Sequence, residues 1–230
     1  MGESAEFPPV ESFGRVFAQV AHVNAAYGVG GIDEPPVRFE QAAPRPRRRG
    51  RRKEPIDPRT LYDARITLDR VVPSRAGSWH DLMNALVWGT FPRAKAALHA
   101  RQHRAISARI PPGARTLPPS RTRELDALAL LDEGGVILAS GPSGAPALPV
   151  VFGHAIYESL AIGIPPAIVA AIELSARAGD AATDRDGHDA DGRVAARLAA
   201  LDAALADVID DASRLRSPEE LRRIDLAARA

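Results

Sequence analysis

The chain has 230 residues, 45% of them hydrophobic but only 5% aromatic, and its formal net charge is +1. It has no cysteine, which excludes disulfide bonds, zinc–thiolate sites and cysteine nucleophiles. No apolar run is long enough to span a membrane and the first residues do not resemble a signal peptide, so we expect a soluble cytoplasmic protein with an aliphatic core.

Residues 1–43 are expected to form a helix followed by an extended segment. Apolar residues recur at helical spacing over residues 10–26, which predicts an amphipathic helix. A glycine-rich stretch at residues 28–31 ends this helix, and residues 35–41 favour a short extended piece.

An arginine-rich segment, residues 44–55, follows. Seven positive charges and no negative charge lie from Arg45 to Lys53, and without them the chain would be net negative. Interleaved proline and glycine, with no apolar residue, predict a disordered and solvated linker. The same charges could contact the phosphates of nucleic acid or a membrane surface, although no aromatic residue lies among them for base stacking.

Residues 56–178 are expected to form the core domain. Loose alternation of apolar residues over residues 62–72 favours a strand. Ser78 or Asp81 can cap a helix that begins near them, and Pro92 can begin the next helix.

The second half of this core contains two apolar runs, residues 125–131 and 136–139, around an acidic turn with two glycines. This arrangement predicts a β-hairpin. Residues 150–162 favour a helix in which His154 and Glu158 lie one turn apart. A proline pair just beyond predicts another helix that extends to the end of the core domain.

An Asp-rich linker, residues 179–192, precedes C-terminal helices over residues 193–230. Residues 193–212 carry an apolar stripe at helical spacing, which predicts a well-defined helix, and residues 218–228 favour a short final one. The chain is therefore expected to be an α+β protein, mainly helical with a small antiparallel sheet or hairpin, plus a C-terminal helical extension.

Three blocks hold the most distinctive residue combinations. They read Trp-His-Asp-Leu-Met-Asn-Ala-Leu-Val-Trp from Trp79, with Phe-Pro-Arg-Ala-Lys from Phe91; Leu-Asp-Ala-Leu-Ala-Leu-Leu-Asp-Glu from Leu125; and Gly-His-Ala-Ile-Tyr-Glu from Gly153. In order and spacing these blocks resemble a bacterial family named domain of unknown function 3025, over residues 60–165. Leu125 departs from the arginine that this family tends to have there. The resemblance implies a folded unit with a pocket and implies no particular activity.

The histidines of these blocks suggest a metal site. His154 and Glu158 are four residues apart on an expected helix, a spacing that lets both side chains reach one ion. His80 could complete the ligand set. Imidazole and carboxylate ligands without thiolate suit zinc, manganese or another divalent ion that keeps an open position for water.

The catalytic candidates beside these ligands are His80, Asp81, Asn84 and Asp126. A metal-bound water would be the nucleophile, and a carboxylate that does not bind the ion could be the general base. We therefore predict a metal-dependent hydrolase. The alternative is a non-catalytic interaction or scaffold protein in which these residues form a structural polar network and Asp81 only caps a helix.

Two basic residues, Arg93 and Lys95, are candidates for binding an anionic group of a substrate. Equally, they could pair with Asp126 or Asp132 at the edge of the core. A weaker alternative is a nuclease of the ββα-metal kind, in which a strand carries a histidine. Arg70 stands where that histidine is wanted, so this similarity is loose.

Overall fold

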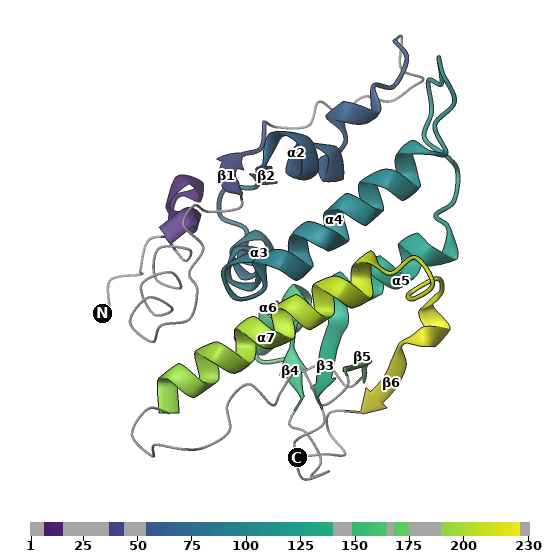
Figure 1. Cartoon of the computed structure of the whole chain (residues 1–230). Coiled ribbons are helices and arrows are strands. Elements are labelled where there is room, and N and C mark those ends of the chain that lie inside the picture. Colours follow the sequence, from purple (N-terminus) through teal and green to yellow (C-terminus); the bar gives the residue numbers. More distant parts are fainter. Residues whose placement is uncertain are drawn as a thin grey trace.

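The computed structural model describes residues 7–15, 37–43, 54–139, 149–164, 168–174 and 190–225. Within these residues, helices predominate and two small sheets complete an α+β fold (Figure 1). The predicted fold class is confirmed. None of the helices in the described ranges is both long and apolar enough to cross a membrane.

The N-terminal elements form a small layer on one side of the molecule. They are the 3-10 helices η1 (Val10–Gly14) and η2 (Pro58–Thr60), the helix α2 (Tyr62–Asp69), and the strands β1 (Arg38–Gln41) and β2 (Val71–Ser74). The two strands are parallel, with Arg38 opposite Val71. Phe13, Phe39 and Trp88 belong to the apolar cluster that holds this layer together. The extended piece predicted near residue 40 is confirmed as β1.

The amphipathic helix expected over residues 10–26 begins as η1, and residues 16–36 lie outside the described ones, as does most of the arginine-rich segment. The strand expected over residues 62–72 is wrong, because α2 occupies most of it. The two buried side chains of α2, Ala64 and Ile66, are two residues apart, which imitates the alternation of a strand.

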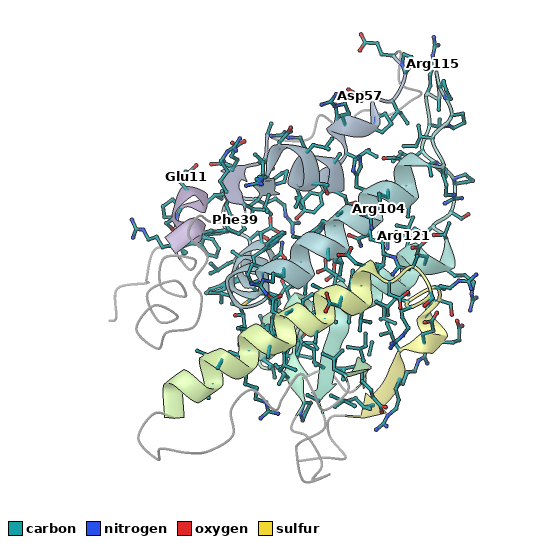
Figure 2. All side chains as sticks on the ribbon, in the orientation of Figure 1. Glu11, Phe39, Asp57, Arg104, Arg115 and Arg121 are labelled. Atoms are coloured by element: carbon teal, nitrogen blue, oxygen red, sulfur yellow. The ribbon has the colours of Figure 1, made fainter. Side chains whose placement is uncertain are left out.

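Three central helices are α3 (Trp79–Thr90), α4 (Pro92–Ser107) and α5 (Arg123–Gly134), and α7 (Ala190–Asp210) lies along α4 (Figure 1). The predicted starts of α3 and α4 are confirmed. Ser78 Oγ accepts the N–H of Asp81 and caps α3, and Pro92 occupies the first turn of α4. Exposed arginines surround the connection from α4 to α5, among them Arg115 and Arg121 (Figure 2).

Two buried charged residues join α4 to α7, one at the start of α4 and the other at the end of α7. The carboxylate of Asp202 on α7 accepts the N–H groups of Arg93 and Ala94 at 3.1 and 2.8 Å, which satisfies two free donors at the start of α4. Arg101 of α4 donates to the carbonyls of Ile209, Asp211 and Arg214 at the end of α7. The helix predicted over residues 193–212 is therefore confirmed as α7 and is fastened to the core.

The second sheet has the strand order β4 (Val150–Val151), β3 (Gly135–Ala139), β5 (Ile168–Leu174) and β6 (Arg222–Asp225). β3 and β5 are parallel, and the two outer pairs are antiparallel. The helix α6 (His154–Ala161) follows β4. The main apolar core lies between this sheet and helices α4, α5 and α7, with Leu128, Ile137 and Leu205 among its fully buried side chains.

The β-hairpin predicted around residues 125–139 is wrong in its first half. Residues 125–131 belong to α5, which Thr122 caps through the N–H of Leu125, and only the second apolar run forms a strand, β3. The buried residues Leu125, Leu128 and Leu131 are three apart, which suits a helix. A short continuous apolar run is compatible with both structures, and the helical cap decides between them.

Three more predicted helices differ from the structure. Residues 150–162 contain β4 before α6 begins at His154. The helix expected beyond Pro166 is wrong, because residues 168–174 form β5, a central strand that is apolar on both faces. The final helix is also wrong, because η5 (Pro218–Glu220) leads into β6, which completes the sheet.

Candidate functional site

A pocket of about 600 Å³ lies where the N-terminal layer meets the starts of α3 and α6 and the end of α5. Its wall combines small apolar residues with histidines, acids, a tyrosine and an arginine. The lining residues are Ala42, Ala43, Tyr62, Pro73, Arg75, Ala76, His80, Asp81, Asn84, Asp132, Glu133 and His154. Segments far apart in the sequence therefore contribute polar groups to one space.

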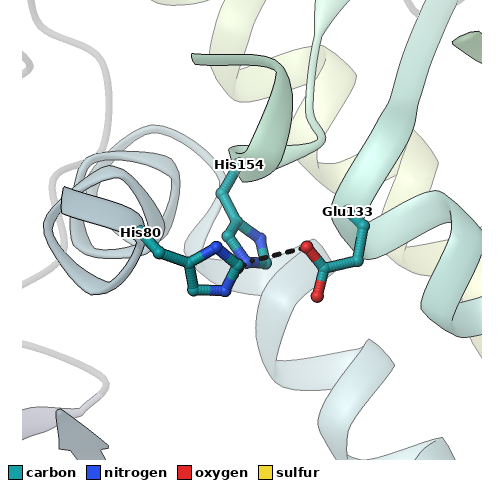
Figure 3. A group of neighbouring side chains, drawn as sticks. All are labelled: His80, Glu133 and His154. Atoms are coloured by element: carbon teal, nitrogen blue, oxygen red, sulfur yellow. Dashed lines mark hydrogen bonds and ion pairs between the residues drawn. The ribbon is translucent and has the colours of Figure 1, made fainter. Parts of the chain in front are cut away.

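His80, His154 and Glu133 form the centre of this pocket. The Nε2 atoms of His80 and His154 are 3.0 Å apart, and Nε2 of His154 is 3.4 Å from Oε2 of Glu133. One ligand atom from each of the three residues lies within 4.8 Å of the other two, and Figure 3 shows the two rings and the carboxylate facing one another. Metal–nitrogen bonds of about 2.0–2.1 Å at tetrahedral angles put ligand atoms roughly 3.4 Å apart, so a divalent ion fits this set after small shifts.

A carboxylate behind His80 fixes its orientation. Oε2 of Glu158 lies 3.0 Å from Nδ1 of His80. A proton on Nδ1 makes this hydrogen bond, which leaves the lone pair of Nε2 directed into the pocket. Metal-binding histidines commonly have such a partner, because it holds the ring and raises the basicity of the ligand nitrogen.

The position of His154 depends on the glycine that precedes it. The N–H groups of Phe152 and Gly153 both donate to the carbonyl of Gly135, at 3.0 and 2.8 Å. A Cβ atom on Gly153 would lie 2.4 Å from the carbonyl oxygen of Glu133 and 2.4 Å from the nitrogen of Gly135. Only glycine lets the chain approach the end of α5 this closely, so the main chain itself brings His154 to Glu133.

Burial and neighbouring charges set the ionisation of the centre. Burial lowers the pKa of His154 to about 4, against the attraction of Asp132, so the ring is neutral and can bind a metal near pH 7. Burial and the charge of Asp132 raise the pKa of Glu133. Burial acts to raise the pKa of Asp132, but Lys95 together with the nearby His154 and His99 outweighs this effect and holds the pKa of that carboxyl well below its usual range.

The opposite wall of the pocket is also polar. Asp81 accepts hydrogen bonds from the backbone N–H of Arg75 at 2.6 Å and from its guanidinium at 2.7 and 3.0 Å. Burial works against the charge on Asp81, and these bonds outweigh it and lower its pKa. Asn84 is buried and its Oδ1 has no hydrogen-bond partner. Burial and nearby carboxylates raise the pKa of Tyr62, so its hydroxyl stays protonated.

The structure brings most of the predicted site residues together. His80 and His154 lie at the centre, and Asp81 and Asn84 line the wall. Glu158 contacts Nδ1 of His80 from behind, so it orients a histidine. Glu133, and not Glu158, belongs to the group of residues that could hold a metal ion.

Three predicted site residues do not face the pocket as expected. Asp126 is exposed in the first turn of α5. Six residues of helix separate it from Asp132, a rise of about 9 Å, because this segment is helical and not a hairpin. The side chain of Arg93 is exposed outside the pocket wall, and Lys95 is fully buried and paired with Asp132 at 2.5 Å. Neither cation lines the pocket.

Glu133 was not predicted as a site residue, and Asp132 was named only as a possible partner of Arg93 or Lys95. Both were assigned to the turn of the expected hairpin. They lie instead at the end of α5, just before the close approach of Gly153. Their place within the second distinctive block was the available signal.

The profile of one known family matches residues 51–149 of the chain. This segment resembles DUF3025, a protein family of unknown function. The resemblance expected from the three blocks is confirmed over that segment, which contains His80 and Glu133, whereas His154 follows shortly after its end. No curated protein and no solved structure shows significant similarity to the chain. The DUF3025 resemblance supports a folded unit and implies no particular chemistry.

The buried His154 predicts a pH-dependent stability of the metal-free protein. Its pKa of about 4 in the fold lies below the usual value of about 6.5, so the unfolded chain takes up a proton first as pH falls. The contribution is complete above about pH 6.5 and is lost between there and pH 4, which lowers the free energy of unfolding by about 3 kcal/mol. Denaturation with chelator at pH 7, 5.5 and 4 measures this loss. His154→Asn should show a shallower decline, and parallel curves would contradict the prediction.

Proposed function

We propose that the protein is a metal-dependent hydrolase whose ion is bound by His80, His154 and Glu133. The observation that carries the proposal is the convergence of their three ligand atoms within 4.8 Å of one another in a pocket. Two imidazoles and one carboxylate suit zinc, and also manganese or iron. Such a set leaves a coordination position for water.

The charges around the site favour a divalent cation. Four carboxylates lie in or beside the pocket, from Asp81, Asp132, Glu133 and Glu158, and Arg75 and Lys95 offset two of them. A divalent ion would balance the remaining two negative charges. Carboxylates that lie close together repel one another, so a bound cation between them would relieve this repulsion.

The chemistry of the proposal is hydrolysis by a metal-bound water. An ion held by His80, His154 and Glu133 would supply a bound water of lowered pKa as the nucleophile. The wall formed by Tyr62, Asn84 and Arg75 would then hold the substrate. The protonated hydroxyl of Tyr62 can donate a hydrogen bond to developing negative charge on a substrate oxygen.

Metal titration is the first test of the proposal. Chelator-treated protein is titrated calorimetrically with Zn²⁺ and Mn²⁺, and its melting temperature is measured with each ion. We expect one ion to bind per chain and to raise the melting temperature by mass action. The loaded protein is then assayed against chromogenic carboxylic and phosphate esters and against DNA and RNA, with His80→Ala as the inactive control. A wild type that binds neither ion would refute the proposal.

The non-catalytic alternative has one specific observation in its favour. The 3.0 Å separation of the two Nε2 atoms is also that of an ordinary hydrogen bond between two neutral rings. The residues would then form a structural network in an interaction or scaffold protein. This alternative predicts that His80→Ala destabilises the chelated protein and that no divalent ion changes the melting temperature.

A further inference from the structure

We infer that Asp132 and Lys95 form a positioning pair for His154, and that metal binding moves the proton of His154 from Nε2 to Nδ1, where Asp132 accepts it in a hydrogen bond. This inference rests on the proposed metal site. It assigns roles to two residues whose side chains do not bind the ion, one of them the fully buried lysine.

The tautomer of His154 without a metal follows from its neighbours. Nδ1 of His80 donates to Glu158, so in a neutral His80 ring Nε2 is an acceptor. The 3.0 Å contact between the two Nε2 atoms then requires His154 to donate from its own Nε2. Nδ1 of His154 is consequently unprotonated and makes no hydrogen bond, although the main-chain carbonyl of Asp132 lies close to the ring.

A metal ion at Nε2 reverses this arrangement. Nε2 of His154 must give up its proton to offer a lone pair, and the neutral ring then carries the proton on Nδ1. A buried N–H group needs an acceptor. Oδ1 of Asp132 lies 3.8 Å from Nδ1, too far for a hydrogen bond now but close enough for a small ring movement to make one. The ring's net protonation does not change.

Lys95 keeps Asp132 ready for this role. Its ammonium is fully buried, 2.5 Å from Oδ1 of Asp132 and 5.8 Å from the centre of the Trp88 ring. Asp132 belongs to α5 and Lys95 to α4, so the pair also holds the end of α5, which carries Glu133, against α4. His80 with Glu158 and His154 with Asp132 thus become two equivalent units, each a ligand ring backed by a carboxylate.

A purely structural ion pair would occupy the same place, so the test must separate the two roles. Replacing a buried ion pair with apolar residues of similar size is often neutral for stability. The double variant Lys95→Met/Asp132→Leu should therefore stay folded while losing the acceptor for Nδ1. We expect its Zn²⁺ affinity to fall 10- to 100-fold, the usual effect of removing an orienting partner. Asp132→Asn is a second, milder variant.

The tautomer is read directly from proton–nitrogen correlation spectra of protein labelled with ¹⁵N-histidine, with and without Zn²⁺. We expect the His154 proton on Nε2 in the metal-free wild type and on Nδ1 in the zinc form.

Glu124→Gln is the matched control for the affinity measurements on the Asp132 variants. It alters the Arg101–Glu124 pair, another partly buried ion pair outside the pocket, and should leave Zn²⁺ affinity unchanged.

The outcomes distinguish this inference from the proposed function. If the wild type binds no Zn²⁺, both fail. If the wild type binds Zn²⁺ but the double variant and Asp132→Asn bind it equally well, or His154 keeps its proton on Nε2 in the zinc form, only the positioning role is refuted.

Discussion

Replacing His80 with alanine is expected to lower the affinity for Zn²⁺ by more than about 100-fold, since losing even an orienting partner of a ligand costs 10- to 100-fold. Glu133→Gln should act in the same direction, because the amide oxygen is a weaker ligand than a carboxylate. Both side chains are partly exposed, at 30% and 50%, so neither change leaves a large cavity. Calorimetric titration with Zn²⁺ measures the loss.

His103→Ala is the control for these ligand variants. His103 is a half-buried histidine on α4 that does not line the pocket. Its removal takes away one imidazole, as His80→Ala does, and should leave Zn²⁺ affinity within twofold of the wild type. If His80→Ala and His103→Ala bound Zn²⁺ equally well, His80 would not be a ligand and the proposed metal site would be wrong.

Gly153→Ala is expected to destabilise the protein by about 3 kcal/mol or more and to abolish Zn²⁺ binding. Its methyl group would lie 2.4 Å from the carbonyl oxygen of Glu133 and from the nitrogen of Gly135, and both are main-chain atoms that cannot rotate away. Relief requires the chain before α6 to retreat from α5, which separates His154 from Glu133. Chemical denaturation gives the stability, and titration of the folded variant gives the affinity.

Gly134→Ala is the matched control for Gly153→Ala. A Cβ atom on Gly134 meets no atom within 4 Å, and the residue has helical geometry at the end of α5. Alanine there should be neutral or slightly stabilising, because it restricts the unfolded chain and suits a helix. If Gly153→Ala behaved like Gly134→Ala, main-chain contact would not control the position of His154.

Local signals in the sequence predicted the elements whose ends they mark. The cap at Ser78 and the proline at Pro92 identify α3 and α4, and the long apolar stripe identifies α7. Several elements without such marks, among them α2 and β5, were assigned wrongly. In β5 the continuous apolar run reflects burial on both faces of a central strand, a property of the assembled sheet that no local period reveals.

The candidate site was predictable in part for the same reason. His80 and His154 stood out because they lie in distinctive blocks, but their convergence depends on the packing of α3 against α6. Glu133 was missed because its assignment followed that of its element: in a hairpin turn it would point to solvent. The burial of Lys95 was one of two alternatives for that residue, and a charged side chain inside a core can be recognised only when its partner is placed.

The main-chain contacts among Gly135, Gly153 and Glu133 have a consequence for ion selectivity. Hydrogen bonds and close packing of the backbone set the main-chain spacing between the candidate ligands Glu133 and His154, so the two residues cannot easily move apart. Calcium prefers six to eight oxygen ligands at about 2.3–2.6 Å, whereas zinc accepts four ligands at about 2.0–2.3 Å. The fixed main-chain spacing would thus favour small transition-metal ions over larger ions such as calcium, and this preference would not depend on the side chains of the surrounding core.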